Sequence, residues 1–577
     1  MPRWAIGVVS LVAAWFIVPH LLHVFTEVIN WDEFALLERA DRTLRFGKVV
    51  GDGRPGLITI LLVPFVRDCI DSARSVVNAR LLWQIITFAY LVGVYFVVRS
   101  WFRHARRPDE GHAQGLIAVA LLAFIPAFVT WSVQVRTDQA ALAAAIWGGV
   151  FLLSTSYRSA AVAGALFAIA LLCTQKALYV LGLCGVLFAT ATGARAWPWS
   201  SVGRRELMLA MGRAAVVVAS LVVVIAIYRY FVPEVSGVAS DGALALAADT
   251  MALSRKTQGY RIYTVHAHRL VVHWALLSVL FVWTLRSLWR REASEYALLA
   301  CCWLTLVLGL IVIWIHGSSF PYFIMTAGLF PALALAMASG RPLTRLGRST
   351  WPVIACLIVF SALQSAPENI EMFDDTQQGQ RDTLKLVYSS GLRERRGYQV
   401  EGALFCSRDP APMRTMFSPG IYTRFRKSPD AEKNSADFIA EFRNRPIAYI
   451  VESHRLMQFP KSITSFLQSH YVWYAHALLI AGFNFESTGE TAELDVIVPG
   501  NYRWVPTSGH RDASIQIDGK MLQPLGIVEL SVGTHPIQAA DRETRGTLML
   551  ADLPIPKETG NPAFYHIRQR AQLGGYR

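Results

Sequence analysis

Acidic side chains stand at two points where apolar sequence meets polar sequence. Asp32 and Glu33 are adjacent in the run Asn-Trp-Asp-Glu-Phe at 30–34, directly after the first apolar segment. Asp138 ends the tripeptide Arg-Thr-Asp and opens an alanine-rich apolar run. Carboxylates at the boundary of a bilayer are costly to bury and commonly mark functional sites. We therefore expect these three residues to line a site on the outer face of a multi-span membrane protein.

The carboxylates suit proton transfer. A carboxylate in a cleft of low dielectric constant can accept the proton of an attacking hydroxyl or amine, and Asp32 or Glu33 can act in this way. The alternative is structural: Asp32 would cap the helix that follows, and Glu33 would favour its N-terminal dipole. Asp138 also has a structural alternative, an ion pair with Arg136 combined with an N-cap. The residue types alone leave these alternatives open.

Basic side chains expected on the same face can neutralise a phosphate, and arginine can bind two of its oxygens. Lys176 is the most informative, because it lies among apolar residues in Leu-Cys-Thr-Gln-Lys-Ala at 172–177. Snorkelling of its ammonium group to the interface is the alternative. The basic run at 254–261 suits a phosphate, but equally the headgroups of anionic lipids. The candidate phosphate-binding residues are Lys176, Arg54, Arg136, Arg255, Lys256 and Arg261.

One histidine and one tyrosine are candidate cleft-lining residues, and the other histidines do not suggest a metal site. His316 and Tyr322 lie in the run His-Gly-Ser-Ser-Phe-Pro-Tyr at an expected outer exit and can line a cleft. His266, His268 and His273 have a poor spacing for one helical face and no adjacent carboxylate, so we interpret them as interface histidines. No P-loop and no GxSxG elbow is present. We expect no cofactor; a divalent metal is possible, but no ligand set is visible.

The composition indicates a membrane protein. Of the 577 residues, 53% are hydrophobic and 17% are charged, against roughly 45–50% and about 25% in soluble proteins. The long apolar runs fall within residues 1–365. The net charge of +14 comes largely from arginine clusters at alternate membrane exits, which identifies these exits as cytoplasmic. We therefore expect no nucleic-acid partner, because the basic residues form no continuous patch.

We expect about eleven transmembrane helices, a cytoplasmic N-terminus and an outer C-terminal tail. The first segment lacks a small-residue cleavage site and is interpreted as a retained span. The first outer loop, 25–78, should hold an amphipathic interface helix at 33–46 and a second short interface helix at 56–66. The expected spans are 4–24, 79–98, 113–132, 139–156, 159–174, 177–193, 208–231, 268–285, 294–315, 321–339 and 350–366.

The fold class is thus a multi-span α-helical membrane domain, 1–366, with an extracytoplasmic tail in two parts. Residues 367–486 read as an α/β region, with helices at 435–444 and 462–470 around a buried strand at 447–451. Residues 487–577 read as a small antiparallel β-sandwich with strands near 494–498, 512–517 and 527–532. Of seven cysteines, Cys69 and Cys406 would face an oxidising compartment, and their pairing cannot be judged from sequence.

The order of these motifs resembles that of the GT-C glycosyltransferase superfamily. An acidic residue follows the first span, an amphipathic helix comes next, and Arg-Thr-Asp precedes an alanine-rich span. The Thr-Gln-Lys element at 174–176, the run at 316–323 and the extracytoplasmic tail look like the protein O-mannosyltransferase and aminoarabinose-transferase branch. The likeness covers roughly residues 1–365.

The resemblance implies an inverting transferase that moves a sugar from a polyprenyl-phosphate donor on the outer face of a bacterial inner membrane. By position, Asp32 would match the first acidic residue of the family, as base or acceptor-orienting group, and Asp138 the second. Lys176 and outer-loop arginines would hold the donor phosphate. The adjacency of Asp32 and Glu33 departs from the family pattern and leaves open which one acts. The acceptor would be a lipid, a glycan or a protein.

Two other functions compete with this interpretation. A transporter or flippase of lipid-linked glycan would place charged residues near the bilayer midplane, often in repeated halves. A non-catalytic membrane anchor would present the β-sandwich to glycans, and would leave Asp32, Asp138 and Lys176 without a role.

Overall fold

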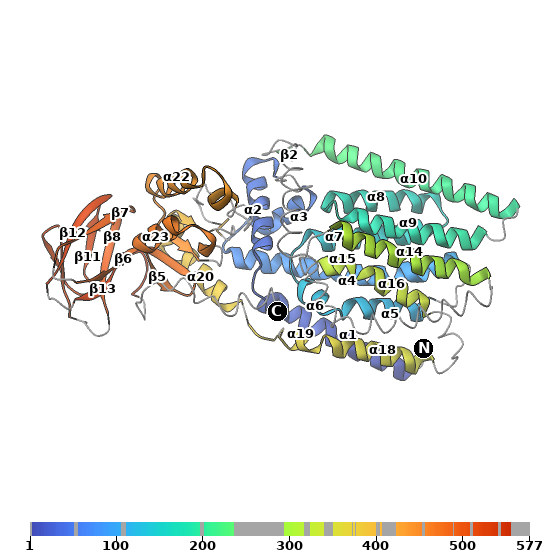
Figure 1. Cartoon of the computed structure of the whole chain (residues 1–577). Helices are drawn as coiled ribbons and strands as arrows, with labels where there is room; N and C mark the ends of the chain where they lie inside the picture. Colours follow the sequence, from blue (N-terminus) through green and yellow to red (C-terminus); the bar gives the residue numbers. More distant parts are fainter. Residues whose placement is uncertain are drawn as a thin grey trace. The chain divides into compact units, whose positions relative to one another are not determined.

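The chain forms two compact units, whose elements are labelled in Figure 1. Unit 1 comprises Met1–Glu27, Arg42–Val63 and Val77–Asp374, and unit 2 comprises Val28–Asp41, Pro64–Val76 and Asp375–Arg577. The computed structural model describes residues 3–50, 56–105, 111–196, 201–232, 234–235, 293–316, 323–339, 350–371, 373–375, 377–399, 404–406, 423–452, 456–487, 490–507, 512–540 and 544–555.

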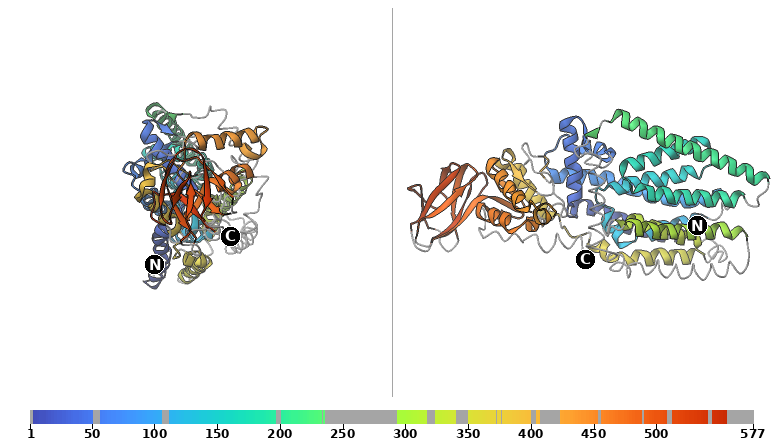
Figure 2. Two further views of the ribbon diagram at one scale, coloured as in Figure 1. Left: turned by 90° about the vertical axis from the view of Figure 1, so that its left-hand side faces the viewer. Right: turned by 45° about the horizontal axis from the view of Figure 1, so that its top comes forward.

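Unit 1 is a bundle of helices whose long axes run roughly side by side (Figure 2). A two-residue parallel pair, β1 (Val49–Val50) with β2 (Glu234–Val235), also belongs to it. Three helices contain residues of both units: α2 (Trp31–Phe46), α3 (Leu57–Val66) and α4 (Ser72–His104). The other described helices of unit 1 are α1 (Arg3–Thr26), α5 (His112–Ala123), α6 (Pro126–Trp131), α7 (Thr137–Leu152), α8 (Tyr157–Cys173), α9 (Ala177–Ala196), α10 (Ser201–Phe231), α14 (Ala293–His316), α15 (Ile324–Ala327), α16 (Leu329–Ala338), α18 (Thr350–Gln364) and α19 (Ala366–Glu371).

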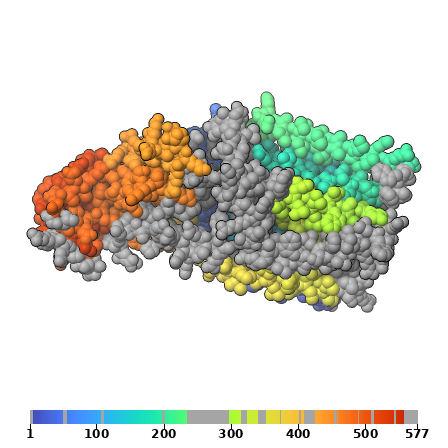
Figure 3. Space-filling model, in the orientation of Figure 1, coloured from blue at the N-terminus to red at the C-terminus, as the bar shows by residue number. Residues whose placement is uncertain are grey.

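Unit 1 holds the membrane region of the chain. Its outer helix α10 exposes large apolar side chains, with Val218 at 61%, Val222 at 57% and Ile227 at 52% exposure, along a surface visible in Figure 3. A stripe of this kind suits lipid rather than water. Among the described residues, five helical segments are long and apolar enough to cross about 30 Å of hydrocarbon: Trp4–Thr26, Ser72–His104, Ala177–Ala196, Ser201–Phe231 and Tyr296–Ile313.

The expected number of crossings is larger than this count. Shorter apolar helices cover several of the remaining runs: His112–Ala123, Tyr157–Cys173, Met325–Ala338 and Trp351–Gln364. The expected span at 268–285 lies outside the described residues. Eleven crossings and the cytoplasmic N-terminus therefore stay predictions. The two short helices expected in the first loop are present as α2 and α3.

One expected span is wrong in detail, because the run 113–132 forms two helices. Helix α5 ends at Ala123, and α6 begins at Pro126. Ile125 between them is extended, with φ −67° and ψ 123°. Proline has no N–H for the helical ladder and disfavours a helical conformation in the residue before it. Because of the break, α6 is a separate short helix. The polar segment that follows it, which includes Arg136, leads into α7.

Small residues bring the central helices close together. A Cβ at Gly164 of α8 would collide with the carbonyl oxygen of Val217 in α10, and one at Gly148 of α7 would meet the ring of Phe167 at 2.6 Å. Helices α7, α8, α9 and α10 pack against one another on such surfaces. Close approach of backbones is how helices gain dispersion energy where lipid offers no hydrophobic driving force. The packing fixes the ends of α7 and α8, which carry the candidate site.

Unit 2 contains the strands of the C-terminal region and the helices beside them. The helical elements after residue 375 are α20 (Gln378–Ser389), η4 (Gly391–Glu394), the short π-helix η5 (Thr423–Lys427), α22 (Ala431–Asn444), η6 (Leu456–Gln458) and α23 (Lys461–His470). The strands are β3 (Gly397–Tyr398), β4 (Tyr449–Val451), β5 (Tyr471–Ala475), β6 (Leu478–Glu486), β7 (Ala492–Val496), β8 (Gly500–Pro506), β9 (Ile515–Ile517), β10 (Lys520–Leu522), β11 (Ile527–Leu530), β12 (Gly533–Ala539) and β13 (Arg545–Leu550).

These strands form two sheets. A seven-stranded sheet has the order β11-β8-β13-β6-β4-β3, with β5 also paired to β6, and a four-stranded sheet has the order β10-β9-β12-β7. Strand β6 pairs with β4 and β5 through its first half and with β13 through its second. The α/β part and the later strands therefore share one sheet. Helices α22 and α23 and strand β4 confirm the three elements expected between 435 and 470.

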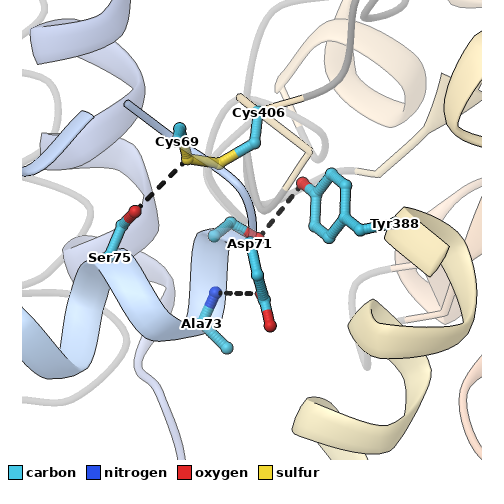
Figure 4. The surroundings of a disulfide bond; sticks show 7 residues. Cys69, Asp71, Ala73, Ser75, Tyr388 and Cys406 are labelled. Carbon is cyan, nitrogen blue, oxygen red and sulfur yellow. Dashed lines mark hydrogen bonds between the residues drawn. A yellow bond between two sulfur atoms is a disulfide. The ribbon is translucent and has the colours of Figure 1, made fainter. Parts of the chain in front are cut away.

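A disulfide joins two distant segments of unit 2. Cys69, in the loop before α4, is bonded to Cys406, 337 residues later, with a Cα–Cα distance of 5.5 Å (Figure 4). This distance is ordinary for a disulfide. The pairing that sequence left open is thus made in the structure.

Glu452 should make the stability of unit 2 depend on pH. It directly follows β4 and is 7% exposed, and burial raises the pKa of its carboxyl group from 4.5 to about 7. Because the folded chain holds this proton more tightly than the unfolded chain, stability should fall as pH rises through that interval, by at most about 1.4 kcal/mol per pH unit. Unfolding of the full chain by urea at several pH values measures the slope.

The variant Glu452→Gln should reduce that slope. Glu493→Gln, which changes an exposed glutamate of β7, is the matched control and should leave the slope unchanged. An equal slope in wild type and Glu452→Gln would contradict the assignment.

Candidate functional site

The N-terminus of α7 is organised by Gln139. Its Oε1 accepts a hydrogen bond from the backbone N–H of Arg136, the N-cap residue, at 3.1 Å. Its Nε2 donates to the carbonyl oxygens of Ser132 and Gln134, both at 2.9 Å. The turn from α6 into α7 is therefore closed by one buried side chain, because polar backbone groups at a helix end need partners. This turn places Asp138 in the first turn of α7.

Asp138 and Lys176 form an ion pair across 38 residues of sequence. Lys176 lies in the turn between α8 and α9, where the N–H of Ala177 donates to the carbonyl of Thr174 at 3.1 Å. Its Nζ is 3.2 Å from Oδ2 of Asp138. The Asp138 side chain is 5% exposed and that of Lys176 is 27% exposed. The structural alternative of an Asp138–Arg136 pair is not what the structure shows, because the ion-pair partner of Asp138 is Lys176.

A small pocket lies beside this pair, with about 10 Å³ of room, enough for one water molecule. The second carboxylate oxygen of Asp138, Oδ1, is buried and has no hydrogen-bond partner among the described residues. Buried carboxylate oxygens are normally satisfied, so an orphaned one beside a pocket suits a ligand that donates a hydrogen bond. The pocket is lined by Asp138, Ala141, Leu142, Thr174, Lys176, Ala177 and Thr326.

In the first acidic motif, the capping residue is Asn30 rather than Asp32. Oδ1 of Asn30 accepts from the N–H of Asp32 at 3.0 Å, and the Glu33 carboxylate accepts from the N–H of Asn30 at 2.9 Å. This reciprocal pair is a capping box, with Asn30 as N-cap and Glu33 three residues later. The structural alternative that gave the cap to Asp32 is therefore wrong.

The capping box separates the roles of the two acidic residues. Glu33 is fully buried at 0% exposure and its carboxylate holds the start of α2, whereas Asp32 is half-buried and contributes its backbone N–H to the box. A carboxylate that closes a cap is poorly suited to take up a proton, because protonation weakens its acceptor role. Asp32 is therefore the better candidate base. Asp32 and Glu33 belong to unit 2, and Asp138 and Lys176 belong to unit 1.

Of the other candidate residues, the structure describes Arg136 in full, His316 in part and the rest not at all. Arg136 is buried; its guanidinium donates to Oε1 of Gln134 at 2.8 and 3.1 Å and lies 4.8 Å from the ring centre of Trp131. His316 is the last residue of α14, and its side chain is outside the described part. The remaining candidates fall outside the described residues: Arg54, Arg255, Lys256, Arg261 and Tyr322.

Sequence reasoning missed a buried polar cluster that holds the end of α1. Arg80 of α4 is 0% exposed and donates to the carbonyl oxygens of Val24 and Glu27 at 3.3 and 2.8 Å. Nε2 of His23 lies 2.8 Å from a carboxylate oxygen of Glu27. Cations at a helix C-terminus stabilise its free carbonyls. An arginine near the start of a long apolar helix was the available signal.

Thr326 was also missed, because nothing near it in sequence marks it. It reaches the pocket only through the packing of α15. Among the described residues, no group of three or more His, Cys, Asp or Glu side chains is arranged to hold a metal ion.

Twelve chains of solved structures match this one, including the following two, which are of low similarity. The oligosaccharyltransferase of Archaeoglobus fulgidus, solved in complex with zinc and sulfate, is 12% identical, with a TM-score of 0.45, over 96% of this chain and 98% of that one. The arabinosyltransferase EmbB of Mycobacterium smegmatis is 13% identical, with a TM-score of 0.35, over 96% of this chain and 63% of that one. At these values neither establishes a fold or function. No protein-family model matches the chain, and no curated protein matches it.

The Asp138–Lys176 pair should show energetic coupling. Lys176→Met leaves the Asp138 carboxylate buried without its cation, which should destabilise the chain by about 1–3 kcal/mol. Adding Asp138→Asn to Lys176→Met should recover about 1 kcal/mol of this loss. Thermal unfolding of the four chains in detergent measures the coupling.

Lys48→Met is the matched control, because Lys48 is an exposed lysine of unit 1. It should leave the melting temperature unchanged. Strictly additive effects of Lys176→Met and Asp138→Asn would contradict the pairing.

Proposed function

We propose that this chain is a membrane glycosyltransferase of the GT-C type. It moves a sugar from a polyprenyl-phosphate donor to a glycan, lipid or protein acceptor on the outer face of a bacterial inner membrane. The observation that carries the proposal is the buried Asp138–Lys176 pair beside a small pocket, with one carboxylate oxygen that has no hydrogen-bond partner among the described residues. The order of motifs in the sequence supports the same class.

In this proposal the phosphate end of such a donor binds at the cation beside the pocket. A lipid-linked sugar phosphate needs apolar surface for its chain and fixed cations for the charge that grows on the leaving phosphate. Lys176 supplies one cation, held in place by Oδ2 of Asp138. Oδ1 of Asp138 is then available to accept from a sugar hydroxyl. Arg54, Arg255, Lys256 and Arg261 complete the phosphate site in this proposal, and His316 and Tyr322 line the cleft.

Asp32 is the proposed base. The acceptor hydroxyl or amine attacks the anomeric carbon, and its proton passes to the Asp32 carboxylate. The bond between that carbon and the phosphate oxygen breaks, and its electron pair leaves with the phosphate. Attack opposite the leaving group inverts the anomeric centre. The assignment rests on the capping box, which commits Glu33 to the start of α2.

The Cys69–Cys406 disulfide supports the outer location. Disulfides persist in oxidising compartments such as the bacterial periplasm and are rare in the cytosol. The bond ties the first loop to the C-terminal region, so both belong on the same side of the membrane. This side is also the one that the arginine clusters leave for the C-terminal tail.

The position of the charged pair favours an enzyme over a transporter. Asp138 lies in the first turn of α7 and Lys176 in the turn before α9, so both stand at helix ends. Transporter sites for ions and substrates lie near the middle of the bilayer on broken helices.

Transfer should depend strongly on Asp32 and weakly on Glu33. We expect Asp32→Asn to lower the rate of sugar transfer by about 10²–10⁴-fold, the usual contribution of a general base. Glu33→Gln should keep most of the activity, because glutamine also closes a capping box. Transfer is measured by mass spectrometry of surface glycans in a deletion strain that carries each variant.

The parent and the deletion strain should differ by the mass of one sugar unit, which identifies the donated sugar. Asp437→Asn, at an exposed aspartate of α22, is the control for loss of a carboxylate. Normal expression with full transfer in both Asp32→Asn and Asp138→Asn would overturn the proposed function.

A further inference from the structure

The segment before α2 is bound to α20 of the C-terminal region by two hydrogen bonds. The N–H of Ile29 donates to Oε1 of Gln380 at 2.7 Å, and Nε2 of Gln380 donates to the carbonyl oxygen of Ile29 at 3.0 Å. One side-chain amide thus satisfies both backbone groups of one residue, 351 positions away. Two parallel bonds fix the orientation of the backbone as well as its distance, as a strand partner would.

Ile29 directly precedes the capping box. Its carbonyl group belongs to the peptide whose N–H, on Asn30, is held by the Glu33 carboxylate. The side chain of Asn30 in turn holds the N–H of Asp32. A continuous set of hydrogen bonds therefore runs from Gln380 through Ile29 and Asn30 to the backbone of Asp32.

Helix α20 is itself firmly seated in unit 2. Leu384 and Val387 are buried at 2% and 0% exposure, and Oγ1 of Thr383 accepts from the N–H of Ala477 in the turn between β5 and β6 at 3.2 Å. These contacts attach the helix to the seven-stranded sheet. A side chain on a well-packed helix gives a more accurate position than one on a loop.

The first loop has two further attachments to the same region, visible in Figure 4. The hydroxyl of Tyr388, also on α20, donates to Oγ of Ser72 at the start of α4 at 3.2 Å. The disulfide of Cys69 with Cys406 lies beside it. The two end segments of the first loop, 28–41 and 64–76, are both parts of unit 2.

We propose that α20 positions the acidic motif and that Gln380 is its positioning residue. The C-terminal region thereby acts as the scaffold that orients Asp32 for proton transfer, in addition to any contact it makes with an acceptor. The inference rests on the proposed function for the role of Asp32. Gln380 acts through the backbone of Ile29 and the capping box and does not touch the reacting atoms.

Hydrogen exchange of the full chain in nanodiscs tests the connection without any assay of transfer. Gln380→Met keeps the length of the side chain and removes both hydrogen bonds. It should speed amide exchange at Asn30, Asp32 and Glu33 by about tenfold. Gln378→Ala, at an exposed glutamine in the same helix, is the matched control and should leave these amides unchanged.

Kinetics test the consequence for catalysis. The rate of sugar transfer is divided by the number of sites that bind a fluorescent polyprenyl phosphate. A variant that yields less folded protein is therefore not mistaken for a slower enzyme. We expect Gln380→Met to lower turnover per site by about tenfold with an unchanged KM for the donor, because the donor pocket is built from residues of unit 1. Gln380→Glu keeps the acceptor for the Ile29 N–H and should give an intermediate loss.

The outcomes separate the two proposals. Exchange at Asn30–Glu33 that is equal in wild type and Gln380→Met overturns the positioning role, as does faster exchange with unchanged turnover per site. If Gln380→Met does not fold, wild-type exchange in Gln380→Glu overturns it in the same way. A wild-type chain without any sugar transfer overturns the proposed function alone, because the exchange experiment does not depend on it.

Discussion

The buried carboxylate of Asp138 is the constraint around which the helical unit is arranged. A carboxylate taken out of water loses several kcal/mol of solvation unless a cation and hydrogen bonds replace it. Lys176 lies 3.2 Å from one oxygen, and the other has no hydrogen-bond partner in the part of the chain that the structure describes. For this pairing to exist, the turn after α6 must deliver α7 in the correct position, and the turn after α8 must hold Lys176 opposite. Gln139 closes the first of these turns, and the close packing of α7, α8 and α9 fixes the second.

The first acidic motif is also arranged by polar groups that need hydrogen-bond partners. The start of α2 needs acceptors for its free N–H groups, and Asn30 and Glu33 supply two of them. Asp32 enters the cap through its backbone N–H. Helix termini of this kind recur in the structure: Arg80 of α4 donates to the terminal carbonyls of α1, and Gln139 accepts the N–H of the N-cap residue of α7. Some of the polar residues that the bundle buries thus serve helix ends. Oδ1 of Asp138 is one of several buried polar atoms without a hydrogen-bond partner among the described residues, and Asp138 also lines the pocket.

Much of this was readable in the sequence, for identifiable reasons. Apolar runs predict helices because a bilayer offers no other partner for backbone groups, and Asp138 and Lys176 are each conspicuous among apolar neighbours. Their contact is not readable, because 38 residues and two turns separate them. The break at Pro126 was available from proline chemistry but was hidden by a continuous apolar run. The sequence Asn-x-x-Glu at 30–33 is a recognisable capping-box pattern. The prediction assigned the cap to the neighbouring Asp32 instead. Thr326, Gln380 and the Cys69–Cys406 pair depend on tertiary packing and leave no local pattern.

The division between Asp32 and Glu33 follows from what each task requires. A capping carboxylate must stay ionised and in place throughout a catalytic cycle, since it holds the first turn of the helix. A general base must gain a proton in each cycle and lose it again, and its charge changes each time. One carboxylate that did both would loosen the start of α2 at the moment when the acceptor must be held most accurately. In the proposed mechanism two adjacent carboxylates divide these tasks: Glu33 is buried in the cap, and Asp32 takes up the proton. The adjacency that made the motif ambiguous in sequence is therefore what would allow a fixed helix start and the proposed base to occupy the same turn.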